Sequence, residues 1–251
     1  MDRMIFVSMS GAKEMMKAQA VNTNNLANVG TIGFKADLEA SNSKPVYGPG
    51  FADRVYATTE GGAAGNAGVD FSQGSIISTG RELDFAINGK GWFAVQAADG
   101  GEAYTRAGNL HLDEVGRLTT ATGNAVLGDG GPITIPNNAK LEIAADGTIS
   151  IQPLGQPVNT LAIIDRIKLV NPPQQQLQKG VDGLMHLPPG QTAEADASVT
   201  TVAGALESSN VNAVSSMVRM IELARAYESH IKLISAAEKN DEASAQMLRM
   251  S

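Results

Sequence analysis

The chain has 251 residues with a net charge of −7, 43% hydrophobic residues, only 4% aromatic residues and no cysteine. This length and apolar content suffice for one sizeable core or two small ones. The acidic charge without a basic block argues against nucleic acid, or an acidic membrane surface, as the main partner. The absence of cysteine excludes zinc–thiolate sites and cysteine nucleophiles.

Residues 3–29 are expected to form a helix, because the segment has no proline and a single glycine. Apolar or small residues occupy a and d positions of a 3.5-residue repeat, but Ser8, Gln19 and Asn22 are polar members of the same register. The apolar or small members are Ile5, Ala12, Met15, Leu26 and Val29. We assign residues 1–33 to an N-terminal assembly helix whose seam would make a poor isolated coiled coil.

In the middle of the chain the hydrophobic pattern changes to a period of two. Residues 34–74, which contain clusters of glycine and proline, are expected to form an extended connector. In residues 75–187, apolar residues such as Phe85 and Ile87 alternate with small or polar ones, and Asp-Gly pairs such as Asp146-Gly147 separate short apolar runs. This pattern predicts an antiparallel all-β core domain.

After a return connector at residues 188–204, residues 205–251 are assigned to a C-terminal assembly helix. Ser208, Ser209 and Asn210 are residues that commonly cap a helix N-terminus. The apolar a and d positions of this helix are Met217, Met220, Ala224, Tyr227, Ile231 and Ile234. The expected fold class is therefore α+β, in which long N- and C-terminal helices pair in a coiled-coil-like core beside a central antiparallel all-β domain.

Each terminal stripe of apolar residues needs a partner, which is either the other end of the chain or another copy. No apolar stretch is long enough to span a bilayer, and the N-terminal apolar run is too short for a cleavable signal peptide. We therefore expect that any export of this chain leaves its N-terminus intact.

Four asparagines, Asn22, Asn24, Asn25 and Asn28, cluster near the end of the first helix. One interpretation is that their carboxamides bond to neighbouring subunits and fix the packing register, as a buried asparagine does in coiled coils. The alternative is a helix end that runs into Gly30, where asparagine is ordinary. Their spacing on two helix faces favours two neighbours.

Enzyme readings find little support in the sequence. His111, His186 and His230 are scattered without the spacing of metal ligands, and no phosphate-binding loop or nucleophile elbow is present. Carboxylate pairs such as Asp113 and Glu114 fit a turn better than a glycosidase centre. We expect no catalytic site, no cofactor and no bound metal.

Four segments, in chain order, resemble the signature motifs of flagellar rod and hook proteins. They are Asn24-Asn25-Leu26-Ala27-Asn28-Val29 with Thr31-Ile32-Gly33-Phe34-Lys35, then residues 81–93, then Tyr104-Thr105-Arg106-Ala107-Gly108-Asn109, and finally residues 204–212 with Arg225-Ala226-Tyr227-Glu228. The resemblance covers both ends and the middle of the chain. It implies a structural subunit that polymerises through its terminal helices into the torque-transmitting shaft of the basal body, where the rod crosses the periplasm.

The partners implied by the resemblance are other proximal and distal rod subunits, the flagellar type III export apparatus and the surrounding rings. Ala224 and Glu238-Lys239-Asn240 favour a proximal rod protein. A distal rod protein is the alternative, and another self-assembling surface fibre is a further one. We assign the assembly interface to Ile5, Met15, Asn22, Asn24, Asn25, Leu26, Asn28, Val29, Asn210, Met217, Met220, Ala224, Tyr227, Ile231 and Ile234.

Overall fold

Two compact units make up the chain. The computed structural model describes residues 3–39, 42–46, 54–58, 68–136, 138–153 and 161–250. The helical unit comprises Met1–Val29, Ala36–Asp70 and Val211–Ser251, and the β unit comprises Gly30–Lys35 and Phe71–Asn210. Much of the expected connector, at residues 40–41, 47–53 and 59–67, lies outside the described residues. Within those that are described, no helix has the length and apolar content needed to cross a bilayer.

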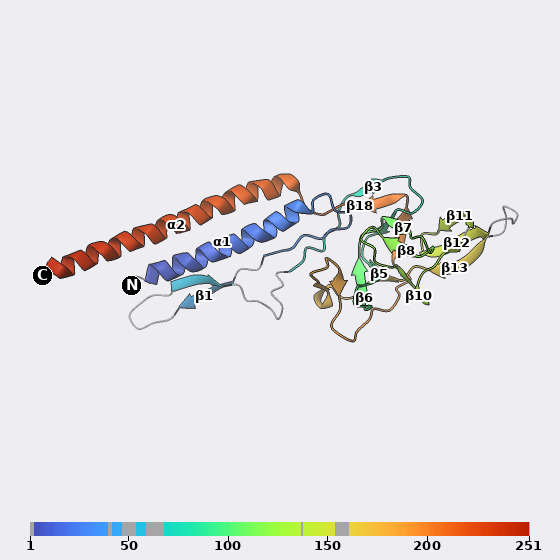
Figure 1. Ribbon diagram of the computed structural model, residues 1–251, viewed down its shortest axis with the longest axis horizontal. Coiled ribbons are helices and arrows are strands. Elements are labelled where there is room, and N and C mark those ends of the chain that lie inside the picture. The colour runs from blue at the N-terminus through green and yellow to red at the C-terminus, as the bar shows by residue number, and fades with distance from the viewer. Residues whose placement is uncertain are drawn as a thin grey trace. The chain divides into compact units, whose positions relative to one another are not determined.

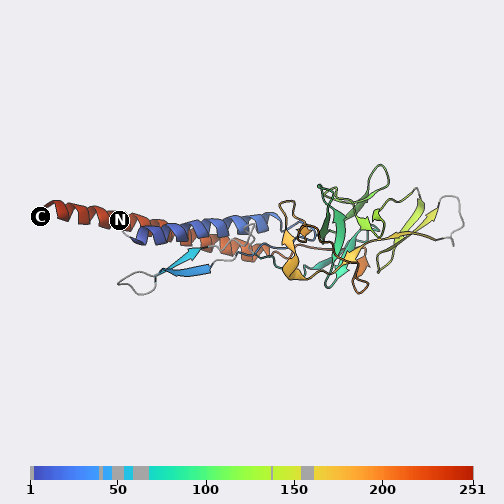
Figure 2. The ribbon, with the colours of Figure 1, turned by 90° about the horizontal axis from the view of Figure 1, so that it is seen from below.

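Two long helices, α1 (Arg3–Ala27) and α2 (Ala213–Met250), dominate the helical unit. They lie side by side in both views (Figures 1 and 2). The expected helices at both ends of the chain are confirmed. The same unit contains a hairpin in which β1 (Asn42–Val46) pairs antiparallel with β2 (Arg54–Thr58).

The start of α2 differs from the expected one. Asn212 caps the helix, because its Oδ1 accepts a hydrogen bond from the backbone N–H of Ser215 at 3.0 Å. Ser208, Ser209 and Asn210 precede this cap and belong to the β unit. A run of several residues with good capping chemistry leaves the position of the cap open, and the last of them is used here.

The β unit is built from short strands, and every strand pair among its described residues is antiparallel. This confirms the expected antiparallel β domain. Its elements are β3 (Ile76–Ser78), β4 (Phe85–Asn88), β5 (Trp92–Gln96), β6 (Glu102–Thr105), β7 (Leu110–Leu112), β8 (Leu118–Thr120), β9 (Leu127–Gly128), β10 (Gly131–Pro132), β11 (Asn138–Ile143), β12 (Thr148–Pro153), β13 (Ala162–Arg166), β14 (Leu169–Val170), the 3-10 helix η1 (Gln174–Gln176), β15 (Gln178–Lys179), β16 (Met185–His186), β17 (Thr200–Ala203) and β18 (Ala205–Glu207).

The largest sheet has five strands in the order β14-β5-β6-β16-β15, and a three-stranded sheet has the order β11-β12-β13. Asp-Gly turns join neighbouring strands in both. Gly147 has a φ of 86°, which favours glycine, and the side chain of Asp146 accepts a hydrogen bond from the N–H of Thr148 at 3.1 Å. The turn at Asp99-Gly100 repeats this arrangement, with Asp99 accepting from Gly101 at 2.9 Å.

One apolar core fills the β unit. Its fully buried members come from alternating positions on several short strands, as a period of two requires. They include Phe85, Ile87, Phe93, Val95, Leu110, Leu118, Val126, Ile133, Ile149 and Ile167. Every member of this core belongs to the β unit.

Residues 200–207 differ from expectation. They were assigned to the return connector and to the start of the C-terminal helix, but they form β17 and β18, which pair with β4 and β3. Thr201, Leu206 and Glu207 are buried there. β17 is four residues long and β18 is three, which is too short for a periodic hydrophobic pattern to be visible in the sequence. The charged residue Glu207 also interrupts the apolar character of β18.

Candidate assembly surfaces

One face of α1 packs against α2. The side-chain Nδ2 of Asn22 donates to the backbone oxygen of Ser216 at 2.8 Å, and Asn22 is only 7% exposed. Farther along, Gly11 meets the ring of His230, since a Cβ placed on Gly11 would lie 2.4 Å from the Cε1 atom of that ring. Residue numbers rise along α1 as they fall along α2, so the two helices are antiparallel.

The predicted residues of α1 lie mostly on this covered side. Ile5, Met15, Leu26 and Val29 are half-buried, and the polar Ser8 and Asn22 of the same register are buried. Asn22 contacts α2 directly through its bond to Ser216, and the predicted coiled-coil seam of α1 stays a prediction.

On α2 the covered face differs from the predicted one. The expected Met220, Ala224, Tyr227 and Ile234 are half-buried, whereas Met217 is 54% and Ile231 is 43% exposed. The buried positions that sequence reasoning missed are Leu223 and Ala237, with half-buried His230 between them. Residues 220, 223, 227, 230, 234 and 237 also follow a 3.5-residue repeat, and the polar His230 within it hid this register.

The asparagine cluster is used partly within the helical unit. Asn25 bonds the backbone of Asp37 in both directions, donating from Nδ2 and accepting at Oδ1, each at 2.8 Å. Asn28 donates to the backbone oxygen of Asn24 at 2.9 Å, four residues earlier, which satisfies a helix-end carbonyl. The side chain of Asn24 is exposed. Contacts of these asparagines with neighbouring subunits stay a prediction.

Asn210, the remaining predicted asparagine, belongs to the β unit. Its Nδ2 donates to the backbone oxygen of Ser72 at 3.3 Å and lies 3.2 Å from the Oγ of the same residue. This side chain therefore ties the segment before α2 to the segment that leads into β3.

Both helices also carry apolar residues on faces that the pair leaves uncovered. On α2 these are Val214, Met217, Val218 and Ile221, which are 72%, 54%, 52% and 55% exposed. Their spacing of three, four and seven residues places them on one face. On α1 the exposed apolar residues are Phe6, Met9 and Met16, which are 62%, 54% and 58% exposed.

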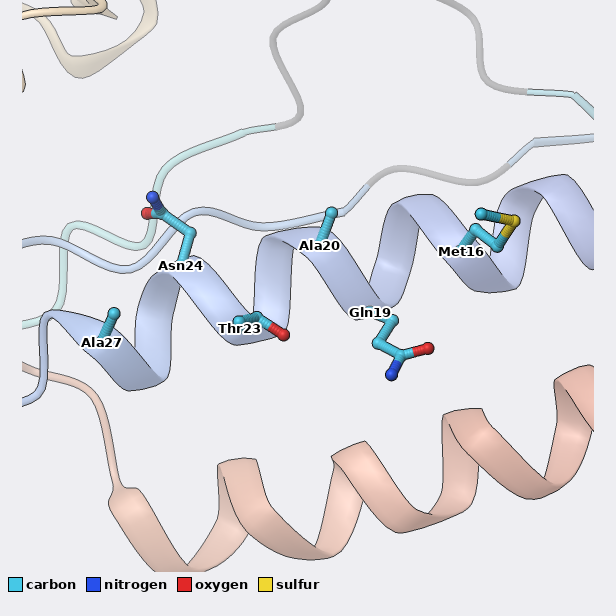
Figure 3. A pocket seen from close by; sticks show the side chains of 6 residues that line it. All are labelled: Met16, Gln19, Ala20, Thr23, Asn24 and Ala27. Atoms are coloured by element: carbon cyan, nitrogen blue, oxygen red, sulfur yellow. The ribbon is translucent and has the colours of Figure 1, made fainter.

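An open groove of about 550 Å³ runs along α1 next to Met16 (Figure 3). Ala20, Thr23 and Ala27 contribute short side chains, and Asn24 contributes an exposed amide. All of the described lining residues lie on successive turns of α1. The lining residues are Met16, Gln19, Ala20, Thr23, Asn24 and Ala27.

Charges within the helical unit gather near the middle of α1. Glu14 is buried and pairs with Lys17 at 3.2 Å. Burial raises the pKa of Glu39 above its ordinary value. The positive charge of Arg219 opposes this shift in the pKa, and the negative charge of the nearby Glu14 carboxylate reinforces it. Glu14, Lys17, Glu39 and Arg219 thus influence one another's charges within the helical unit.

In the β unit, three of the four motif segments meet at a buried ion cluster. Glu207 is fully buried, and its two carboxylate oxygens contact Lys35 Nζ at 2.6 Å and Arg106 Nη1 at 2.8 Å. We call Lys35, Arg106 and Glu207 the Glu207 cluster. Lys35 is the last residue of the first motif, Arg106 lies in the third and Glu207 in the fourth, so residues far apart in sequence are joined at one point.

Further hydrogen bonds hold the Glu207 cluster in place, while the buried Nε of Arg106 has no hydrogen-bond partner among the described residues. Glu207 Oε1 accepts from the N–H of Gly74 at 3.0 Å, and Arg106 Nη2 donates to the backbone oxygen of Gly89 at 2.7 Å. The Arg106 guanidinium lies 5.3 Å from the ring centre of Trp92, which comes from the second motif. Burial lowers the pKa of Arg106 from its ordinary value, and Glu207 counteracts that shift.

The motif segments can be recognised in the sequence, but their meeting at this cluster is not predicted from it. The available signal was a single charged residue inside an otherwise small or apolar segment, as with Arg106 in Tyr104-Thr105-Arg106-Ala107-Gly108. Such a residue is expensive to bury without a partner of opposite charge, but the sequence does not show which distant charged residue that partner is.

Two family models match the chain. The flagellar hook protein FlgE/F/G D1 domain matches residues 86–151, and the flagellar basal body rod FlgEFG protein C-terminal region matches residues 202–247. The flagellar basal-body rod protein FlgF of Salmonella typhimurium is 41% identical over 257 aligned residues, covering all of both chains. The chain belongs to the flagellar basal-body rod family.

Other relatives agree with this assignment. FlgF of Escherichia coli K12 is also 41% identical with full coverage of both chains, and FlgG of Bacillus subtilis is 33% identical over 269 residues, covering 94% of this chain and 96% of its own. The chain is therefore more similar to these FlgF proteins than to that FlgG protein. It is a structural subunit of the flagellar basal-body rod.

Proposed function

We propose that this chain is a proximal rod subunit that joins its neighbours through α1 and α2. The observation that carries this proposal is the set of uncovered apolar faces on both helices, with Val214 72% and Phe6 62% exposed. Exposed apolar stripes of this kind mark surfaces that associate with other proteins. The greater similarity to FlgF than to FlgG supports the proximal position.

In this proposal the helices of many copies form a coiled-coil-like core. The α1–α2 pair of one molecule is a two-helix hairpin with polar Ser8 and Asn22 in its seam, and it would be marginal alone. Burial of the outer apolar faces against neighbours would offset the entropy of ordering the helices. Close-packed helices resist shear, which suits a shaft that transmits torque.

How the chain reaches the rod is a further proposal, which rests on membership of the family. We infer that the chain passes through the flagellar type III export apparatus without loss of its N-terminus, and that it meets other rod proteins and the surrounding rings after export. The observation that supports this is that Ile5 is half-buried and Ser8 is buried, so α1 uses both residues in its packing. Mass spectrometry of the chain from purified basal bodies should find these residues present.

A distal rod position is the second candidate, and the 33% identity with FlgG of Bacillus subtilis over most of the chain favours considering it. The two positions predict different places along the rod. Labelled chain should be found near the base of the rod in purified basal bodies if it is proximal. A label confined to the segment next to the hook would assign it to the distal rod.

A direct test of the structural role uses a strain that lacks this gene. Cells that express the intact chain should regain motility and rods, and cells that express Gly30–Asn210 alone should not, because both helices are missing. Motility restored by the shortened chain would show that α1 and α2 are dispensable, and it would refute assembly through them.

A further inference from the structure

Each helix of the helical unit has a second face, turned away from the α1–α2 contact. Successive helical residues turn by about 100°, so Ile221 lies on the opposite side of α2 from Leu223, which is buried against α1. Val214, Met217 and Val218 share the outer side with Ile221. On α1, Met16, Ala20, Thr23 and Ala27 recur every three or four residues and form the outer groove (Figure 3).

The two outer faces are complementary in size. The α2 face presents large apolar side chains that are each more than half exposed. The α1 groove is lined by the short side chains of Ala20, Thr23 and Ala27, interspersed with the longer Met16, Gln19 and Asn24. Large side chains from one helix pack into the space that small ones leave on another. Within one molecule these faces point away from each other, so only a second molecule can bring them together.

One pair of opposite charges can also be placed across the two faces in the register that matches them in size, in which Arg225 of the same α2 face lies opposite Met16. Lys13 lies on the outer face of α1, one turn before Met16, and Glu228 lies on the outer face of α2, two turns after Ile221; both are exposed. Consider two antiparallel helices in which Lys13 faces Glu228. Ala20 lies seven residues after Lys13 and Ile221 lies seven residues before Glu228, so Ala20 then faces Ile221.

The same register continues along the groove. Thr23 then faces Val218, Asn24 faces Met217, and Ala27 faces Val214. A parallel arrangement that keeps Lys13 opposite Glu228 instead places Ala20 opposite Ser235 and Thr23 opposite Glu238, which leaves the apolar face of α2 without the groove.

We infer that the outer face of α2, from Val214 to Glu228, docks antiparallel into the outer groove of α1 on a second copy of this chain. The inference rests on the proposed function and names the surfaces that would carry it. The contact joins different surfaces of the two copies, so each docked copy offers a free α1 groove or α2 face to the next. Copies that share one orientation along an axis bring α2 and the neighbouring α1 together in this antiparallel sense.

Disulfide mapping tests the contact directly, because the chain contains no cysteine. Two single-cysteine variants, Ala27→Cys and Val214→Cys, carry different epitope tags and are expressed together in the gene-deleted strain. Basal bodies are then purified and oxidised. The expected result is a shift of both tags to a common band of twice the chain mass. The Ala20→Cys and Ile221→Cys pair should give the same shift.

Mismatched pairs serve as controls. Ala27→Cys with Ile221→Cys displaces one partner by seven residues, or about 10 Å along the helix, and should give no joint band. Met16→Cys with Ile231→Cys reports the parallel arrangement. Three results would overturn the inference. The first is a joint band for Met16→Cys with Ile231→Cys, and the second is a Val214→Cys homodimer without any joint band to Ala27→Cys. The third is no joint band at all from variants that are present in basal bodies.

A charge exchange covers the case in which the cysteine variants fail to assemble. Lys13→Glu and Glu228→Lys should each lower the amount of chain in basal bodies, and the double variant should restore it. Normal assembly of both single variants, or no recovery in the double variant, would contradict the docking register. Absence of the unaltered chain from basal bodies is a separate result, which would refute the proposed function itself.

Discussion

Replacing Glu207 by glutamine should destabilise the β unit strongly. Glu207 is fully buried and pairs with Lys35 at 2.6 Å and Arg106 at 2.8 Å, and both cations are themselves at most 5% exposed. The substitution keeps the size of the side chain but leaves two buried positive charges without their counter-charge. Removing one partner from a buried ion pair costs about 3–5 kcal/mol.

The loss can be measured with the chain's own fluorophore. The sequence has one tryptophan, Trp92, and it lies beside Arg106, so its fluorescence reports unfolding of the β unit. Urea titrations should give a free energy of unfolding lower by the amount above, and thermal melts should shift down by roughly 10 °C.

A matched control separates burial from charge. Lys140 and Glu142 form a surface pair at 3.7 Å with side chains 59% and 58% exposed. Glu142→Gln removes the same charge there and should change stability by less than about 0.5 kcal/mol. Lys35→Met should cost less in the Glu207→Gln background than in the unaltered chain. A loss below about 1 kcal/mol for Glu207→Gln would refute the view that this cluster holds the motif segments together.

Three further predictions concern the helices and one buried tyrosine. Leu26→Asp and Ile231→Asp should each abolish rod assembly, because an unpaired charge in a helix contact costs several kcal/mol. The melting of the β unit, followed by Trp92 fluorescence, should stay unchanged. A motile strain with either variant would show that the substituted position faces solvent in the rod. Gly11→Ala should weaken the α1–α2 pair by about 1–3 kcal/mol, seen as lost helical circular dichroism, because its Cβ would meet His230 at 2.4 Å. Gly30→Ala, with no atom within 4 Å of its added Cβ, is the control, and equal effects of the two changes would contradict the contact. Burial raises the pKa of Tyr104, whose hydroxyl donates to Glu102 at 2.9 Å. The pKa of Tyr104 in the folded state lies above its unfolded value near 10, so its contribution to stability is present below about pH 10 and is lost as the pH rises above that value. Tyr104→Phe should therefore reduce the loss of stability at alkaline pH. An unchanged profile of stability against pH in that variant would exclude Tyr104 as the source of the loss.

The parts of the fold that depend on local pattern could be predicted from the sequence. A long stretch without proline, carrying a 3.5-residue repeat, predicts α1 and α2, and Asp-Gly turns between alternating residues predict the antiparallel β unit. The first and last residues of helices and strands are harder to predict from the sequence. Several adjacent residues can cap a helix, so Asn212 could not be chosen over Asn210 from sequence.

The parts that depend on contacts between distant residues could not be predicted. Two registers of α2 follow a 3.5-residue repeat, and they share Met220, Tyr227 and Ile234. The choice between them is made by a glycine on the other helix, since Gly11 leaves room for His230. The Glu207 cluster likewise joins residues 172 positions apart, and no periodicity links Lys35 to Glu207.

The most direct measurement is a reconstruction of the rod in purified basal bodies at a resolution that separates helices and shows large side chains. The proposal of assembly through the terminal helices predicts α1 and α2 of this chain packed on helices of neighbouring subunits, with Val214, Met217, Val218 and Ile221 covered. A rod in which this chain contacts its neighbours only through the β unit, with that face of α2 open to solvent, would contradict it.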